Sequence, residues 1–218
     1  MKDIENTKKE APLKESPFLG LTGMGGGVAS LMWHHAAGVE TGGLWVWGSA
    51  GSGVYGRNSA NPNDRRSSPV QVGTDTDWST LSNSAQGAGG NHNNFRGKSD
   101  GTLWATGSPR EDGGGTEYGL LGLNDNILRS SPTQIPGEWT GAVANGRSIK
   151  LATKKDGTLW SWGYGERGTL GLNTPTYTRR SSPTQIPGTW AGVADGQGSS
   201  FRAVKADGSC WTSGAGAL

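Results

Sequence analysis

The chain has 218 residues and a formal net charge of +2, with 20 basic side chains against 18 acidic ones. This balance excludes a basic surface of the kind that binds nucleic acids, and the single cysteine excludes an internal disulfide framework. Glycine supplies 39 residues and ten tryptophans outnumber the other aromatic residues, although hydrophobic residues make up only 32% of the chain. Such a mixture is typical of short strands joined by many tight turns rather than of disorder.

The first forty residues differ from the rest of the chain. Residues 1–15 carry four acidic side chains, which argues against an export signal. Residues 16–39 are uncharged, but glycines, Pro17 and two histidines interrupt them, so we expect no membrane span. The glycines are too numerous for a helix, which predicts an extended arm over residues 1–40 that docks on a partner. Its candidate docking residues are the large apolar ones: Phe18, Leu19, Leu21, Met24, Leu31, Met32 and Trp33.

From residue 41 onward, a set of landmarks recurs in fixed order. A strand-like run occurs four times, around Trp45, Trp104, Trp160 and Trp211. The first three runs are each followed by the same landmarks: Gly-x-x-Gly-x-Asn, Arg-Ser-Ser-Pro, another tryptophan and Asp-Gly. The Gly-x-x-Gly-x-Asn segments are residues 53–58, 119–124 and 168–173; the later tryptophans are Trp78, Trp139 and Trp190; the aspartates are Asp100, Asp156 and Asp207. Repeats of about 50 residues indicate propellers, solenoids or arrays. We therefore predict units at about 41–100, 101–156 and 157–207, and the opening strand of a fourth at 208–218.

Each unit reads as a small antiparallel sheet of about four short strands. Asp156–Gly157 predicts a two-residue hairpin turn, in which both residues take a positive φ. In the strand that follows, Trp160 and Trp162 fall on one face and Leu159 on the other. The prolines of residues 181–188 predict an edge strand. One buried tryptophan stabilises by only about 5 kcal/mol, against an ordering cost of at least about 1 kcal/mol per residue, so neighbouring sheets must cover one another.

Residues 156–173, DGTLWSWGYGERGTLGLN, resemble the repeats of the regulator of chromosome condensation family. The resemblance covers about residues 41–218 and implies β-propeller blades. Members of that family include a nucleotide-exchange factor for a small GTPase and a secreted inhibitor of β-lactamases, so the fold implies no single function.

The chain departs from the family pattern in two respects. The family histidine seven residues before the aspartate is replaced at Asn93, Ile149 and Ser200, and three units fall short of the family's seven blades. Three arrangements are compatible with this number of units. Other copies of the chain complete the ring, the blades form an open array, or a small atypical ring closes within the chain. Unless the ring closes within the chain, sheet edges or faces need a partner.

Other motifs are better explained by structure than by chemistry. Residues 51–56 and 163–168 both read Gly-x-Gly-x-x-Gly, but no amphipathic helix follows either stretch, so neither predicts a phosphate site. We assign the His34–His35 pair to arm packing rather than to a metal site with Glu40. Glu111 and Asp112 lie in an insertion, residues 108–118, that we interpret as a solvated loop rather than a glycosidase pair.

Two further predictions concern recurring or single residues. Arg66, Arg129 and Arg180 recur in register with the repeat, and we expect each guanidinium to bond carbonyls or a carboxylate of its own or the next blade. Cys210 is predicted to be a small core residue.

The sequence thus predicts an all-β, non-enzymatic structural or assembly protein with blade repeats and an N-terminal arm. We expect no catalytic residues, no cofactor and no metal. The glycine-rich arm resembles arms in structural proteins of marine tailed phages, which implies a virion component, in the tail, an appendage or the capsid decoration. Its partners would be other virion proteins or copies of itself in a homo-oligomer, with a host surface receptor as a further candidate. The alternative is a receptor- or glycan-binding module that uses propeller loops, with the insertion at 108–118 as its distinguishing feature; an enzyme such as a glycan hydrolase ranks third.

Overall fold

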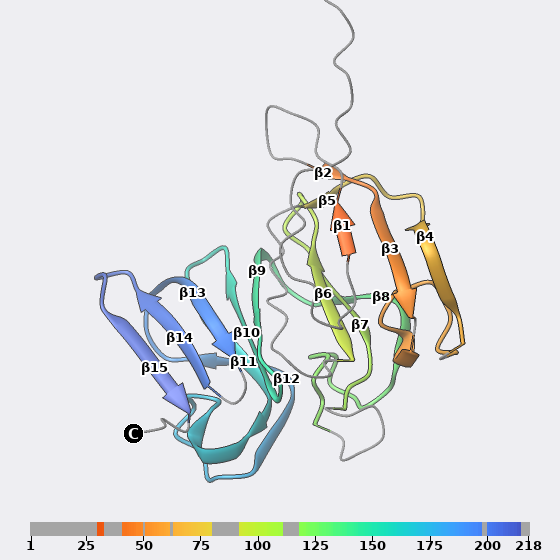
Figure 1. The fold of residues 1–218 in the computed structure, drawn as a ribbon. Coiled ribbons are helices and arrows are strands. Elements are labelled where there is room, and N and C mark those ends of the chain that lie inside the picture. Colours follow the sequence, from red (N-terminus) through yellow and green to blue (C-terminus); the bar gives the residue numbers. More distant parts are fainter. Residues whose placement is uncertain are drawn as a thin grey trace, which may run out of the picture.

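The structure, a computed structural model, describes residues 30–32, 41–49, 51–61, 63–79, 92–110, 118–197 and 200–214. These residues form antiparallel strands and two short 3-10 turns, η1 (Gly51–Gly53) and η2 (Glu166–Gly168) (Figure 1). The predicted all-β class is confirmed. None of the described residues belongs to a helix long and apolar enough to cross a membrane.

The strands build four consecutive sheets. The first contains β1 (Ser30–Met32), β3 (Leu44–Ser49) and β4 (Arg65–Val72), with β2 (Thr41–Gly42) paired to β5 (Trp78–Ser79) beside it. The second contains β6 (Asn93–Gly97), β7 (Leu103–Gly107) and β8 (Arg129–Ile135). The third contains β9 (Trp139–Asn145), β10 (Ile149–Lys154), β11 (Leu159–Gly165) and β12 (Thr178–Ile186). The last contains β13 (Trp190–Gln197), β14 (Ser200–Lys205) and β15 (Cys210–Gly214).

The third sheet shows the complete blade. Its four strands follow one another as a meander, with the repeat's Arg-Ser-Ser-Pro segment in the outer strand β12. The sheet runs from Trp139 to Ile186, so the Asp156–Gly157 hairpin lies at its centre. Each sheet therefore straddles a boundary between two units of the sequence repeat.

The Asp-Gly hairpins are not the two-residue turns that the sequence predicts. Gly157 has a φ of 80°, whereas Asp156 is not among the residues with positive φ. The Gly157 N–H donates to the Lys154 carbonyl at 3.0 Å and the Lys154 N–H donates to the Thr158 carbonyl at 2.9 Å, which encloses a three-residue loop. The reason is the Asp156 carboxylate, which accepts a hydrogen bond from the Thr158 N–H at 2.9 Å and so favours an Asx turn with ordinary φ at the aspartate.

The glycine that follows the second tryptophan position marks a β-bulge. The pairing of β11 with β12 shifts between Ser161 and Gly163, and Gly163 has a φ of 104°. A Cβ at Gly163 would overlap the Ser148 carbonyl oxygen, which accepts a hydrogen bond from the Tyr164 N–H at 2.8 Å. Gly107 repeats this arrangement in the second sheet. The recurring glycine is therefore needed for a close approach of two backbones.

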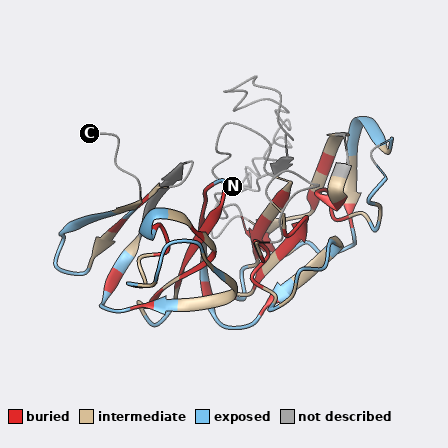
Figure 2. Cartoon of the chain, turned by 90° about the horizontal axis from the view of Figure 1, so that it is seen from below, coloured by how far each residue is buried: buried red, intermediate tan, exposed pale blue. Residues whose placement is uncertain are grey.

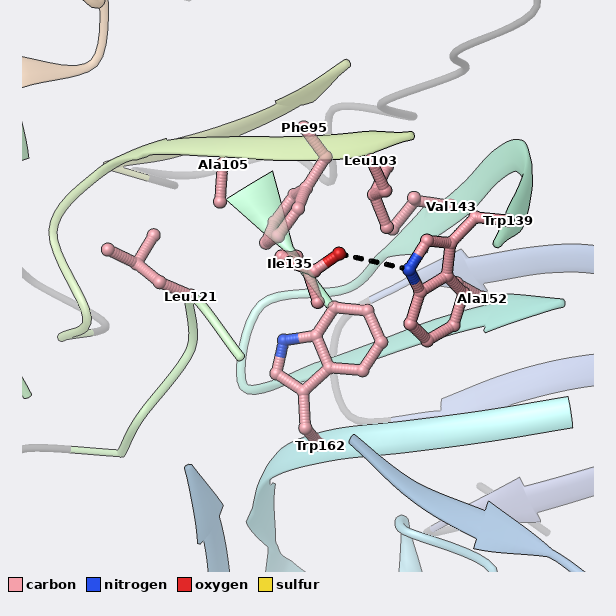
Figure 3. Packing of buried hydrophobic residues seen from close by; sticks show 9 residues of the cluster. All are labelled: Phe95, Leu103, Ala105, Leu121, Ile135, Trp139, Val143, Ala152 and Trp162. Atoms are coloured by element: carbon pink, nitrogen blue, oxygen red, sulfur yellow. Dashed lines mark hydrogen bonds between the residues drawn. The ribbon is translucent and has the colours of Figure 1, made fainter. Parts of the chain in front are cut away.

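Hydrophobic cores lie between consecutive sheets (Figure 2). Between the second and third sheets, Trp162 packs edge-on against Phe95, with ring centroids 5.8 Å apart, and Trp139 donates from Nε1 to the Ile135 carbonyl at 3.3 Å (Figure 3). Leu159 faces the opposite core, between the third and last sheets. The predicted division of this strand into a tryptophan face and a leucine face is confirmed, and neighbouring sheets do cover one another.

Candidate interaction surface

Each Asp-Gly hairpin carries the same polar network. Asp156 Oδ1 accepts hydrogen bonds from the N–H and Oγ1 of Thr158, at 2.9 and 2.6 Å, and Thr158 Oγ1 accepts one from Trp160 Nε1 at 2.7 Å. The same three bonds recur in Asp100–Thr102–Trp104 and in Asp207–Ser209–Trp211. The hydrogen bonds from Thr158 hold the pKa of Asp156 below its ordinary value. These carboxylates are held in hydrogen bonds within their own hairpins.

A lysine completes each network, and sequence reasoning missed it. The Lys154 ammonium lies over the rings of Trp160 and Trp139, at 3.8 and 5.2 Å from their centroids. Lys98 and Lys205 occupy the same place in the second and last sheets. The available signal was a lysine two residues before each Asp-Gly, which extends the motif to Lys-x-Asp-Gly-[Ser/Thr]-x-Trp.

Lys98 has acidic neighbours in addition to its tryptophans. Its Nζ lies 2.6 Å from Asp75 Oδ2 and 3.2 Å from Asp77 Oδ1. Burial acts to lower the pKa of Lys98, but the hydrogen bonds to the two aspartates outweigh burial and raise the pKa above its ordinary value. Lys98 is therefore cationic at neutral pH.

The Gly-x-x-Gly-x-Asn loop of each of the first three sheets is bonded to the strand of the next sheet that carries the repeated tryptophan (β7, β11 or β15). Thr106 Oγ1 donates to the Val54 carbonyl at 2.9 Å, Trp162 Nε1 to the Leu120 carbonyl at 3.0 Å, and Ser213 Oγ to the Gly168 carbonyl at 2.7 Å. The donors occupy the same repeat position although their side chains differ. We call the contact between such a loop and the next sheet a blade joint.

The outer strand of the next sheet forms the other half of a blade joint. The Asn58 N–H donates to the Ser130 carbonyl at 2.6 Å, and the Asn124 N–H donates to the Ser181 carbonyl at 2.8 Å. A Cβ on Gly53 or Gly119 would press on the Cα of the same serines. Glycine in the loop and serine in the outer strand are thus both required by the close approach, which explains why both recur.

The last blade joint has only its first half. The loop of residues 168–173 receives Ser213 from β15, but no described residue accepts a hydrogen bond from the Asn173 N–H, and a Cβ on Gly168 would meet no described atom within 4 Å. No described strand pairs with the outer edge of β15, whereas β11 pairs there with β12. We call the outer edge of β15 together with this loop the open joint.

Most side chains of β15 are exposed because no described strand lies along its outer edge. Trp211 is 50% exposed, and Cys210 is exposed while its counterparts Leu103 and Leu159 are fully buried. The prediction that Cys210 is a core residue is wrong for the described part of the chain, because no strand or blade described there covers the face on which it lies.

Two of the three recurring arginines form ion pairs with an aspartate that is close in sequence. Arg66 lies 3.0 Å from Asp64, and Arg129 lies 2.5 Å from Asp125. The prediction of an intramolecular carboxylate partner is confirmed for these two. Arg180 has no ion pair within the part of the chain that the structure describes.

The candidate docking residues fall mostly outside the described residues, as Phe18, Leu19, Leu21, Met24 and Trp33 do. Leu31 and Met32 lie in β1, opposite Trp45 and Leu44 of β3, so this part of the predicted arm is a strand of the first sheet. Their role in docking to a partner stays a prediction. His34, His35, Glu40, Glu111 and Asp112 also lie outside the described residues.

A small cavity lies between the first and second sheets, lined among others by Tyr55, Trp78 and Trp104. Its volume of about 20 Å³ has room for roughly one water molecule and for no substrate. Arg96 also lines it; burial lowers the pKa of this guanidinium to about 10, so Arg96 stays cationic at neutral pH. Within the described residues no group of three or more His, Cys, Asp or Glu side chains is placed to hold a metal ion.

Antiparallel four-strand meanders stacked through shared cores define propeller-type blades. Residues 156–201 match the Regulator of chromosome condensation (RCC1) repeat. The regulator of chromosome condensation of Xenopus laevis is 35% identical to this chain over 103 residues, which are 46% of this chain and 22% of that protein.

The same fold appears in solved structures. Human WBSCR16 superposes with a TM-score of 0.61 at 21% identity, over 80% of this chain and 43% of that structure. Yeast RCC1 (Prp20), solved bound to Kap60, gives a TM-score of 0.58 at 21% identity, over 79% of this chain and 40% of that structure. The chain thus spans less than half the length of these structures, and its described sheets have the fold of RCC1-type propeller blades. The predicted resemblance to these repeats is confirmed.

Proposed function

We propose that the protein is a non-enzymatic structural and assembly protein that associates through the open joint. The observation that carries the proposal is the half-built last blade joint, in which the edge of β15 and the Asn173 N–H lack the outer strand that the two preceding joints have. An exposed strand edge is a template for pairing with another chain.

The complete blades define what the missing strand must look like. In the third sheet, Leu159 pairs with Ile186 and Ser161 pairs with Thr184. By the same register, the incoming strand would place an apolar residue opposite Cys210 and a small residue against Gly168. These requirements describe the chain's own outer strands, which read Arg-Ser-Ser-Pro with an apolar residue three positions after the proline.

We propose that a second copy of the chain supplies this strand. β4 has the required sequence, and its residues Arg65–Pro69 are exposed. The inner edge of β4 pairs with β3, but no described strand pairs with its outer edge, so β4 would join β15 through that outer edge. β4 and β15 lie at opposite ends of the array of sheets (Figure 1). Contacts between opposite ends of a molecule are heterologous and build a closed ring or an open chain of copies.

The narrower part of the proposal is that this assembly belongs to the virion of a tailed phage, in the tail, an appendage or the capsid decoration. It is supported by the resemblance of the N-terminal arm to arms of phage structural proteins. In this view the arm docks the assembly on other virion proteins.

A peptide of the third sheet's outer strand tests the proposal. The peptide TRRSSPTQIP, residues 178–187, is added in excess to the full chain, and binding is followed by the fluorescence of the tryptophans, of which Trp211 borders the open joint. We expect saturable binding and dissociation of assembled copies. The control peptide carries Leu at the Ser181 position, where the loop glycine would leave no room, and it should not bind. Equal behaviour of the two peptides, or no binding by either, contradicts the proposal.

A further inference from the structure

Three of the chain's four tyrosines gather at one place on the third sheet. The rings of Tyr118 and Tyr164 are stacked with centroids 4.4 Å apart and an interplanar angle of 17°, and Tyr177 lies 6.2 Å from Tyr164. The Arg179 guanidinium lies over Tyr118 and Tyr164, 5.5 and 5.8 Å from the ring centroids. We call these four residues the tyrosine cluster.

The blade repeat does not require these tyrosines. Tyr164 pairs across the sheet with Arg179, and the equivalent pair in the first sheet is Ser49 with Arg65. At the position of Tyr164 the second sheet also has a serine, Ser108. Tyr118 closes the insertion at 108–118, and Tyr177 lies in the loop before β12. The aromatic rings therefore occur where the blades differ from one another, which is where a repeat scaffold places its specific contacts.

Tyr177 is held outward at a conformational cost. Its side chain is 64% exposed, and its φ of 70° lies in the left-handed region that bulky residues rarely adopt. The Tyr177 N–H donates to the Gly165 carbonyl at 3.0 Å, which fixes this conformation. Strain of this kind at an exposed aromatic residue is characteristic of binding sites rather than of packing.

Arg179 adds a positive charge to the cluster that forms no ion pair with a described residue. It is exposed, and no carboxylate in the described part of the chain lies within ion-pair distance of it. Its contact with two tyrosine rings orients the guanidinium while its N–H groups remain free to bind a carboxylate, in a two-pronged geometry that lysine does not offer.

The surroundings favour a small polar ligand over a macromolecule. Of the four large hydrophobic residues that are exposed in the described part of the chain, only Tyr177 belongs to the cluster, so the apolar centre of a protein interface is missing. A single-stranded nucleic acid needs a track of cations, whereas the nearby Arg167 is already 3.6 Å from Glu166. Tyrosine rings suit the C–H face of a sugar ring, and one free guanidinium suits one carboxylate.

We propose that the tyrosine cluster binds a saccharide that carries a carboxylate group. The sugar ring stacks on Tyr177 and the exposed parts of Tyr118 and Tyr164, and Arg179 binds the carboxylate. Phenol hydroxyl groups donate to or accept from the sugar hydroxyls. The tyrosine cluster would thus be the binding site of the glycan-binding module that the sequence predicts as an alternative. This proposal does not depend on assembly through the open joint.

The test is binding of the full chain to oligogalacturonate and sialyllactose, with neutral galactose oligomers and lactose as the uncharged counterparts, measured by isothermal titration. We expect at least one acidic saccharide to bind about tenfold or more tightly than its neutral counterpart, the effect of one charge-assisted contact. Arg179→Gln should remove this preference, and Tyr177→Ala should weaken binding to both kinds of saccharide.

Arg202→Gln is the control, because Arg202 is an exposed arginine of β14 outside the tyrosine cluster; it should leave binding unchanged. Tyr177→Ala should also leave the native mass unchanged, which separates this site from the proposed assembly. Binding to neither acidic saccharide overturns the inference. So does tighter binding of a single-stranded oligonucleotide that Arg179→Gln abolishes, since the cluster would then be a nucleic-acid site.

Discussion

At the scale of single residues, the four-part network of aspartate, hydroxyl, tryptophan and lysine is the most regular feature of the protein. Asp156 fixes Thr158, Thr158 fixes the Trp160 indole, and Lys154 lies over that indole. The ammonium group of this lysine also lies 5.2 Å from the ring centroid of Trp139, so it contacts two tryptophans. The network explains the repetition of residue types that contribute little to the core.

Replacing Lys154 with Met should weaken the fold by about 1 kcal/mol, because the aliphatic stem is kept and only the cation over two indole rings is lost. Urea unfolding followed by tryptophan fluorescence measures this. Arg202→Met, an exposed position on β14, is the control and should change stability by less than about 0.5 kcal/mol. Equal effects of the two substitutions would contradict a role for the cation.

The aspartates of the network predict a loss of stability in acid. Hydrogen bonds from the residue two positions later lower the pKa of Asp100, Asp156 and Asp207 below the ordinary value of 3.8. Because the folded pKa lies below the unfolded one, the unfolded chain takes up protons first as the pH falls. The stabilisation is therefore complete well above pH 3.8 and is lost as the pH falls through that value towards the folded pKa.

Urea midpoints measured between about pH 6 and pH 3 test this dependence. A variant with Asn at the three positions keeps an oxygen acceptor but does not titrate. Its midpoint should fall less steeply with decreasing pH than that of the natural chain. Parallel pH profiles would show that the three aspartates do not contribute.

At the scale of the element, the third strand of each blade depends on the glycine of its bulge. Gly163→Ala should cost about 2 kcal/mol or more, because a positive φ is combined with overlap between the new Cβ and the Ser148 carbonyl. Gly208→Ala is the control: its φ is 85°, but a Cβ there would meet no described atom within 4 Å. It should cost only about 1 kcal/mol. Thermal and urea unfolding would show whether the two glycines differ.

Much of the fold at this scale was accessible from the sequence. The spacing of Trp160 and Trp162 correctly predicts which side chains share a core, because alternation along a strand is fixed by backbone geometry. The turn type was not accessible, since the Asp156 carboxylate competes with the two-residue turn through a hydrogen bond that the Asp-Gly pair alone does not indicate. The lysine over the tryptophans was missed because charged residues near a turn are usually solvated.

The candidate sites were less predictable than the fold. The sequence predicts Cys210 as a small core residue, and only the arrangement of the sheets shows that no described element covers it. The blade joints depend on contacts between residues about 40 to 70 positions apart, such as Asn58 with Ser130, which no local pattern encodes. The tyrosine cluster likewise unites residues from an insertion, a strand and a loop.

At the scale of the whole molecule, four sheets are stacked through three cores and two complete blade joints, and the third joint is half-built. Each complete joint joins a glycine loop to the serine of the next outer strand. The free outer edges of β4 and β15 at opposite ends give the array a direction. Copies that meet head to tail would join the outer edge of β4 to the edge of β15.

The most direct test of this account is the native mass of the full chain, measured by light scattering during gel filtration over a wide range of protein concentration. Head-to-tail assembly should give species heavier than the 22.6 kDa chain, in whole multiples, that dissociate when the outer-strand peptide is added. A monomer at every concentration, with no response to the peptide, would contradict it, because the open joint would then be closed within the chain.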